Sequence, residues 1–224
     1  MLKVNNLDKN KRLKYEKIVS SHLSKTTEIK NRMVDCCMDS ILMAADTISE
    51  SLRLDGKLLL CGNGGSAADC QHMAGELVNW LNKDFQRPGL AAIALTTDTS
   101  VISAIANDSS FDSVFERQVE ALGRYGDVII GISTSGNSPN VIRAVRAAKK
   151  IGMKAIVLTG EGGKLAELAD VVVSVPSENT QYIQEAHLAA EHILCSLIEQ
   201  HLFVDFANTE VDLLNPTAEN NNVV

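Results

Sequence analysis

The sequence predicts an α/β fold, in which a doubly wound parallel sheet of about five strands is flanked by helices. Two observations predict it: short, continuous apolar runs recur along the chain, and segments with helical spacing lie between most of them. Strands that are buried on both faces of a parallel sheet have this unbroken apolar character. The runs are residues 57–61, 91–95, 128–132, 155–159 and 171–175.

Residues 27–54 form the longest predicted helix, because apolar side chains recur there at helical spacing from Ile29 to Ile48. A long apolar stripe on an N-terminal helix is typical of an oligomerisation surface, so we expect this helix to mediate subunit contacts. A C-terminal helix is predicted from about Thr180 to Leu202 and is expected to share that role. Shorter helices are predicted at residues 67–81, 99–106, 111–123, 139–151 and 164–168.

The 224 residues are enough for one large domain with appendages. We expect an N-terminal extension over residues 1–25, which is rich in Lys, Asn and Ser and either helical or partly disordered. The domain itself is expected to span residues 26–203. The acidic, Asn-rich segment 204–224 is expected to be a flexible tail.

Composition narrows the functional classes. The net charge is −7 and no basic block occurs, which argues against nucleic-acid binding and leaves any anionic ligand to local geometry. No stretch approaches the roughly 18 apolar residues of a membrane span, and the N-terminus lacks the apolar core of a signal peptide. The five cysteines have no CxxC spacing, so we expect reduced thiols and a cytoplasmic location.

A hydroxyl-rich loop follows the third predicted strand. Ser138 has the character of a helix N-cap and Pro139 that of the first helical residue. The free N–H groups of that first helical turn, together with the helix dipole, favour an anion. The sequence therefore predicts a phosphate-ester site, the alternative being an ordinary polar turn. The hydroxyls are those of Ser133, Thr134, Ser135 and Ser138.

A glycine-rich loop, Cys61-Gly62-Asn63-Gly64-Gly65-Ser66, follows the first predicted strand. It lacks the G-x-G-x-x-G spacing of dinucleotide sites and the Gly-Lys-Ser/Thr of a P-loop, so no nucleotide is expected. Glycines let the backbone approach a small ligand closely, and Asn63 offers an amide. Two such loops at the carboxyl ends of parallel strands predict a site for a small phosphorylated metabolite.

Two helices carry groups capable of acid–base chemistry. His72 and Glu76 are four residues apart and share one helical face. Gln184 and His192 are eight apart, about two turns, and lie roughly on one face of the C-terminal helix, whereas His187 points elsewhere. Taken singly, the first pair is more typical of a solvated polar stripe than of a site, and a lone histidine is more typical of a structural or boundary residue.

As an ordered set, several motifs resemble those of sugar isomerase (SIS) domain proteins over roughly residues 30–203. Among these proteins, the chain is most similar to the members that convert sedoheptulose 7-phosphate to D-glycero-D-manno-heptose 7-phosphate in lipopolysaccharide heptose synthesis. The resemblance implies a homotetramer with active sites between subunits. The motifs are the glycine loop, Thr97-Asp98-Thr99-Ser100, Asn107-Asp108, residues 126–138 and Ile183-Gln184-Glu185-Ala186-His187.

The resemblance also implies roles for individual residues. Glu76 and His192 would be the acid–base pair that moves a proton through an enediol, and zinc would bind His72, Glu76, Gln184 and His192. A carboxylate held tightly by zinc is a poor base, so these two implied roles of Glu76 conflict. The implied substrate-binding residues are Asn63, Gly64, Gly65, Glu76, Asn107, Asp108, Ser133, Thr134, Ser135, Ser138 and Gln184. Asn107-Asp108-Ser109-Ser110 is equally typical of a plain turn.

Some positions depart from the SIS pattern and leave alternatives open. Trp80 stands about where related enzymes carry an Arg, and Gln181-Tyr182 replaces a more usual Asp-Arg, which makes recognition of the sugar end less secure. We expect Trp80 to be a packing residue at a subunit contact. One alternative function is a non-catalytic SIS adaptor that associates with the DNA replication initiator; Glu76, which such adaptors lack, argues against it. The other is a SIS isomerase of another sugar phosphate.

Overall fold

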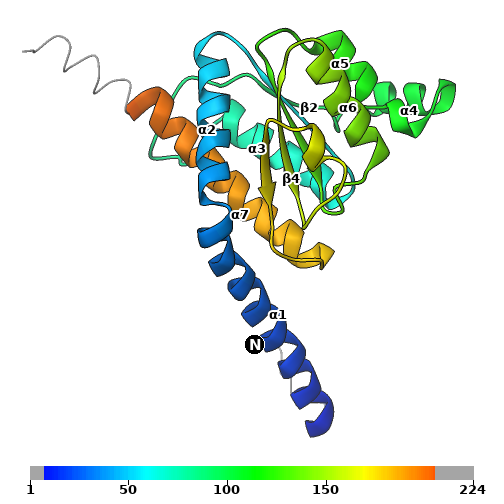
Figure 1. Cartoon of the computed structure of the whole chain (residues 1–224). Helices are drawn as coiled ribbons and strands as arrows, with labels where there is room; N and C mark the ends of the chain where they lie inside the picture. Colours follow the sequence, from blue (N-terminus) through cyan, green and yellow to red (C-terminus); the bar gives the residue numbers. More distant parts are fainter. Residues whose placement is uncertain (1–7, 205–224) are drawn as a thin grey trace, which may run out of the picture.

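The fold is known from a computed structural model that describes residues 8–204. At its centre lies one sheet of five strands, all parallel, in the order β2-β1-β3-β4-β5 (Figure 1). Each of the five predicted apolar runs forms one of these strands, so the predicted fold class is confirmed. The strands are β1 (Leu58–Gly62), β2 (Ala92–Ala94), β3 (Val128–Ser133), β4 (Lys154–Thr159) and β5 (Val171–Ser174).

The strand order creates a switch point between β1 and β3. The chain moves outward from β1 to β2 on one side and from β3 to β5 on the other, so β1 and β3 are neighbours. Their register pairs Gly62 with Ile132, which brings the two carboxyl ends to the same level. In open parallel sheets a ligand binds outside the strands at this point. The glycine loop and the hydroxyl-rich loop both begin there.

Helices cover both faces of the sheet, as the alternation of side chains along each strand requires. Leu58 and Leu60 pack in the core beneath α2, α3 and α7, whereas Leu59 and Cys61 pack in the core beneath α5 and α6. The helices of the domain are α2 (Met38–Arg53), α3 (Gly65–Val78), α4 (Thr99–Asp108), α5 (Glu116–Leu122), α6 (Pro139–Lys150) and α7 (Thr180–Glu199).

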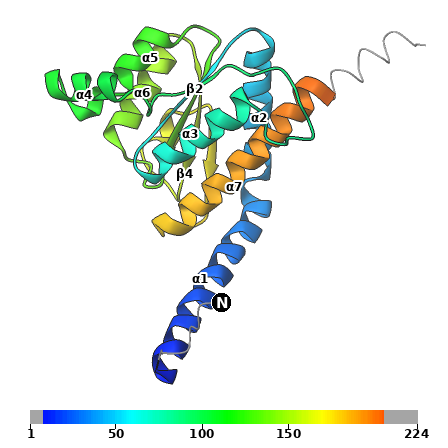
Figure 2. The same cartoon turned by 180° about the vertical axis from the view of Figure 1, so that it is seen from behind.

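The N-terminal region differs from the prediction. The single helix predicted over residues 27–54 is wrong: α1 (Lys9–Cys36) and α2 meet at Cys37. The buried Cys37 thiol donates to the carbonyl oxygen of Ser174, a long-range contact that no local spacing reveals. The first half of α1, within the predicted extension, projects from the domain in both views (Figures 1 and 2).

Two further segments complete the fold. The short helix predicted at residues 164–168 is a single 3₁₀ turn, Ala166–Leu168, and the C-terminal helix passes into a π-helical turn, Gln200–Val204. The predicted flexible tail lies outside the described residues from position 205 onward. Between residues 8 and 204, no helix has the length and apolar character needed to cross a membrane.

A buried ion pair ties the C-terminal ends of α3 and α7 together. The Nε atom of Arg87 lies 3.0 Å from Oε1 of Glu199, and both side chains are almost completely buried. The guanidinium also donates to the carbonyl oxygens of Glu76 and Leu77. These oxygens are in the last turn of α3, where no following turn of the helix provides N–H donors. The same Glu199 oxygen accepts from the backbone N–H of Leu81. Arg87 therefore caps the helix that carries His72 and Glu76.

We predict that Arg87→Met lowers the free energy of unfolding by about 3–5 kcal/mol, because it leaves the Glu199 carboxylate buried without its cation. Denaturant unfolding measures this. Arg117→Met is the control, since Arg117 pairs with Glu120 at the surface and an exposed pair contributes little. Equal losses in the two variants would contradict the prediction.

Candidate active site

The hydroxyl-rich loop has the predicted local structure: α6 begins at Pro139, with Ser138 as its N-cap. The Ser138 side chain does not cap the helix. Instead, Oγ of Ser133 lies 2.9 Å from Oγ of Ser138 and 3.5 Å from Oγ of Ser135. Three hydroxyls therefore converge beside the free N–H groups of the first turn of α6, an arrangement suited to phosphate oxygens. Thr134, the fourth residue of the set, is half-buried beside them.

A second segment holds this loop in place. Gly136 has a φ of 63°, and a Cβ atom there would stand only 2.5 Å from the carbonyl oxygen of Gly162. Its own carbonyl accepts from the N–H of Leu165, and the side chain of Asn137 accepts from the N–H of Lys164. The loop that carries the hydroxyls is thus held in place by its contacts with residues 162–165.

A pair of amides joins the hydroxyl-rich loop to the glycine loop. Asn63 and Asn140 each donate to the side-chain oxygen of the other, at 2.9 and 2.8 Å. Asn63 is therefore a link between the loops, with one N–H left for a ligand. Asn140 was missed by the sequence analysis, because its second position in a helix carries no signal for a partner 77 residues away. Gly64 and Gly65 are exposed beside this link, at the start of α3.

The acid–base residues come together where α7 lies along α3 (Figure 2). The Nε2 atoms of His72 and His192 are 2.8 Å apart, and Oε1 of Glu76 lies 3.8 Å from Nε2 of His72. Both imidazoles are exposed, whereas the Glu76 side chain is only 21% exposed. The structure thus brings three of the predicted residues to one place, although the two histidines are 120 positions apart in the sequence.

The short separation of the two histidines has a chemical consequence. At 2.8 Å, one nitrogen must donate a proton and the other must accept it, so the pair holds a single proton between its facing nitrogens. Such a pair can take a proton from one reacting atom and return it to another. Glu76 adds a carboxylate on the same face.

The fourth predicted residue of this set, Gln184, lies farther toward the start of α3. Its Nε2 is 3.3 and 3.4 Å from the two carboxylate oxygens of Asp69, which is itself buried. A Cβ atom on Gly65 would clash with the nitrogen, carbon and oxygen of this amide, so the amide rests on the glycine. Gln184 therefore lies between the glycine loop and the histidine pair.

Two polar residues that the sequence analysis did not assign to the site lie on the buried face of α7. Neither carboxylate oxygen of Glu191 has a hydrogen-bond partner within residues 8–204, and burial, followed by the nearby charge of Asp69, raises the pKa of Glu191 to about 8. His187 is also completely buried, and its Nε2 donates to the carbonyl oxygen of Thr159. Burial lowers the pKa of His187 to about 4, so this histidine is neutral and structural.

The residue types around the histidine pair suit zinc, for which two imidazoles and a carboxylate are ordinary ligands. The Oε2 atom of Glu76 is buried and, within the described chain, has no hydrogen-bond partner. As they stand, no three His, Cys, Asp or Glu side chains of residues 8–204 are spaced to hold a metal ion. The histidine nitrogens would have to move apart, since two nitrogen ligands of one tetrahedral zinc lie about 3.3 Å from each other.

The structure does not bring every predicted residue together. Asn107 and Asp108 close the C-terminal end of α4, where the Asn107 amide donates to the Asp108 carboxylate. Both views show α4 at the opposite edge of the domain from α7 (Figures 1 and 2). These two residues therefore lie away from the histidine pair of the same chain.

Comparisons with known proteins identify the family of the chain. Residues 21–160 match the SIS domain family. The chain belongs to the SIS domain family. It is 48% identical, over 186 residues, to a phosphoheptose isomerase of Roseiflexus sp., and the match covers 83% of this chain and 93% of the relative.

Two solved structures of the family are similar over the same extent. A phosphoheptose isomerase from Neisseria gonorrhoeae has a TM-score of 0.78 and 45% identity, covering 83% of this chain and 99% of that one. One from Francisella tularensis has a TM-score of 0.79 and 37% identity, covering 83% and 98%. The family resemblance inferred from the motifs is thus confirmed.

Proposed function

We propose that this protein is an aldose–ketose isomerase that converts sedoheptulose 7-phosphate to D-glycero-D-manno-heptose 7-phosphate, a step of lipopolysaccharide heptose synthesis. The observation that carries the proposal is the His72–His192 pair, 2.8 Å apart, with the Glu76 carboxylate beside it. Similarity to proteins named phosphoheptose isomerase supports the same substrate. The five free thiols support a reducing compartment, and we place the enzyme in the cytoplasm.

The phosphate is held at the switch point. The hydroxyls of Ser133, Ser135 and Ser138 converge beside the N-terminus of α6, where backbone N–H groups and the helix dipole favour an anion. No cationic side chain is needed for this grip, which suits a product that must leave. The Asn63–Asn140 link fixes this loop relative to the glycine loop and hence to α3.

The reaction then moves one proton between carbons and one between oxygens. Glu76 removes a proton from C1 of the ketose, next to the C2 carbonyl, and the electron pair forms the C1–C2 double bond of an enediol. His192, sharing its proton with His72, protonates O2, and the hydroxyl proton on O1 returns to the pair. Glu76 then delivers its proton to C2, which leaves an aldehyde at C1 and an unchanged enzyme.

The adaptor alternative is not favoured. It predicts a chain without the catalytic carboxylate, whereas Glu76 is present and faces the histidine pair. The same assay tests for activity on a different sugar phosphate when that compound is offered in place of sedoheptulose 7-phosphate.

We predict that Glu76→Gln or His192→Gln lowers turnover of sedoheptulose 7-phosphate by about 10²–10⁴-fold, since each removes a proton-transfer group. A coupled or direct assay of heptose 7-phosphate formation measures this. His201→Gln and Glu120→Gln are matched controls and should retain full activity, because both residues lie outside the site. Full activity in both site variants would refute the proposal. Turnover of another sugar phosphate alone would change the substrate.

We further propose that His72, Glu76 and His192 bind zinc, with Gln184 as a weak fourth ligand. The buried, unpartnered Oε2 of Glu76 supports this, since the described part of the chain offers it no hydrogen bond. Bound zinc would displace the proton that the two histidines share and would take its place as the acid, a Lewis acid, for the sugar oxygens. Binding through one carboxylate oxygen would leave the other to act as the base, which would reconcile the two roles of Glu76.

We expect about one zinc per chain in the purified protein, with chelation lowering turnover and added zinc restoring it. Elemental analysis and the isomerase assay measure the two quantities independently. His72→Ala should lose the zinc, whereas His201→Ala should keep it. Full zinc content in His72→Ala would contradict the site, and unchanged turnover after complete removal of the metal would contradict its role.

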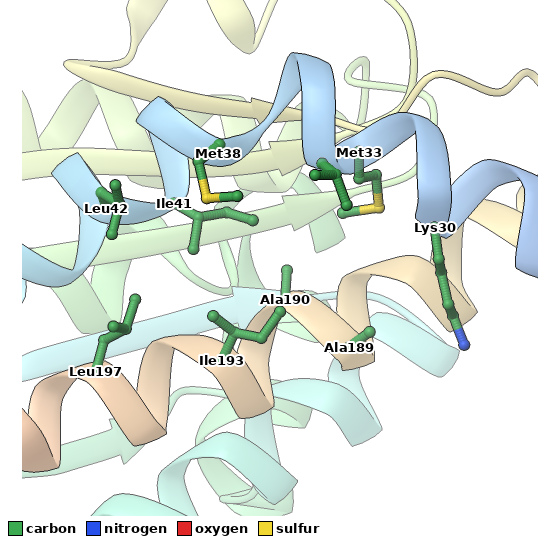
Figure 3. A pocket seen from close by; sticks show the side chains of 10 residues that line it. Lys30, Met33, Met38, Ile41, Leu42, Ala189, Ala190, Ile193 and Leu197 are labelled. Atoms are coloured by element: carbon green, nitrogen blue, oxygen red, sulfur yellow. The ribbon is translucent and has the colours of Figure 1, made fainter.

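We propose that the protein is a homotetramer. An apolar groove of about 390 Å³ runs between the junction of α1 with α2 and the middle of α7. Its side chains face each other across the gap from the two sides (Figure 3). Apolar members include Met33, Met38, Ile41, Leu42, Ile193 and Leu197.

The projecting part of α1 extends this apolar surface. Ile18, Val19 and Leu23 are each more than half exposed, in the part of α1 that projects from the domain. Such a helix is marginal alone and is stabilised when its apolar stripe is covered. A second copy offers the same stripe and groove, which makes the contact self-complementary. In such an assembly, we propose, Asn107 and Asp108 serve the site of a neighbouring subunit.

We predict that Leu42→Asp shifts the tetramer toward smaller species, because it places a charge in the groove. Light scattering or sedimentation measures the mass. Leu54→Asp is the matched control, since Leu54 is exposed at the end of the same helix but outside the groove, and its mass should stay tetrameric. A monomeric wild-type protein would overturn the assembly.

A further inference from the structure

The contact between Asp69 and Gln184 has no place in the reaction as written above. Asp69 is on α3, one turn before His72, and only 6% of its surface is exposed. Both of its oxygens face Nε2 of Gln184, at 3.3 and 3.4 Å. Burial raises the pKa of this carboxyl group, and the hydrogen bond from Gln184 opposes the rise. A carboxyl group has thus been placed in the interior beside a residue of the site.

The contact is directional. A primary amide has a donor end and an acceptor end of almost the same shape, so packing alone cannot choose between its two orientations. A carboxylate only accepts hydrogen bonds, and it therefore selects the NH₂ end of Gln184. Gly65 leaves room for the amide as a whole, since a Cβ atom there would meet its nitrogen, carbon and oxygen alike, so the choice between the two ends rests on Asp69. The carbonyl oxygen of the amide can then accept a hydrogen bond from a ligand in the site.

The position of the contact indicates which part of a ligand is concerned. Along α3 and α7, the contact of Asp69 with Gln184 comes before the contact of His72 with His192. Asp69 is one turn before His72, and Gln184 is about two turns before His192, so this contact lies next to the histidine pair, toward the N-terminal ends of both helices. The phosphate loop approaches from β3, a different strand. An oriented Gln184 would act on the sugar and not on the phosphate.

We infer that Asp69 is a positioning residue, which holds the Gln184 amide so that its carbonyl oxygen, and not its N–H, faces the sugar. When substrate binds, this oxygen leaves its place as the weak zinc ligand proposed above and accepts a hydrogen bond from a sugar hydroxyl near the reacting carbons. This inference rests on the proposed isomerase function. A flipped amide would present two donors to a hydroxyl that must then act as acceptor, and would lose the orientation of the substrate over Glu76.

The variant Asp69→Asn tests this, since it keeps the size of the side chain but can both donate and accept. We expect the KM for sedoheptulose 7-phosphate to rise roughly tenfold, as for the loss of one hydrogen bond to an oriented group. The inhibition constant of inorganic phosphate should stay unchanged, because the hydroxyl loop is untouched. Asp112→Asn, at an exposed position, is the control and should match the wild type. Thermal unfolding verifies that each variant is folded.

A double-mutant comparison separates orientation from general damage. If Asp69 acts through Gln184, then Asp69→Asn has no further effect in a Gln184→Ala background. Multiplying effects would overturn the inference, as would an unchanged KM in Asp69→Asn or an equal weakening of phosphate inhibition. Should Asp69→Asn fail to fold, Asp69→Ser removes the carboxylate without added bulk and carries the same expectations. A wild-type protein without turnover would remove the proposed function and this inference together, whereas an active wild type with an indifferent Asp69→Asn removes the inference alone.

Discussion

The packing of α7 along α3 is the interaction on which the site depends. The two helices are more than a hundred residues apart in sequence, and neither alone carries a working set of groups. Side by side, they join His72 to His192 and Gln184 to Asp69. The ends of both helices are then locked by the ion pair of Arg87 with Glu199. A shift of one helix along the other by a single turn, about 5.4 Å, would separate every one of these pairs.

The sheet supplies the second constraint, because it decides where the phosphate loop stands relative to α3. β1 and β3 are neighbours in register, so the glycine loop and the hydroxyl-rich loop emerge at the same level. The reciprocal amide pair of Asn63 and Asn140 then fixes the distance between them. Anchor and reacting groups are therefore attached to one rigid edge, which is how a small substrate can be held at one end and transformed at the other.

Much of this could be predicted from local sequence, and the parts that could not share one physical reason. Unbroken apolar runs identified all five strands, and the Ser138-Pro139 pair identified the start of α6. Pairings across long distances left no local signal: the bond of Cys37 to Ser174 that accompanies the break between α1 and α2, the partner of Asn63, and the carboxylate behind Gln184. Motif resemblance supplied the acid–base residues, but it could not show what orients them.

Polarity is distributed unevenly about the site, and this distribution has a cost. The groups that meet substrate, His72 and His192, are exposed, whereas several groups that support them are buried. Arg87 and Glu199 neutralise each other, but Glu191 has no hydrogen-bond partner among residues 8–204, and its pKa is raised to about 8. Since burial disfavours the charged carboxylate, Glu191 is largely protonated at neutral pH. An apolar residue at this position would avoid that penalty, so stability alone does not account for the glutamate immediately before His192.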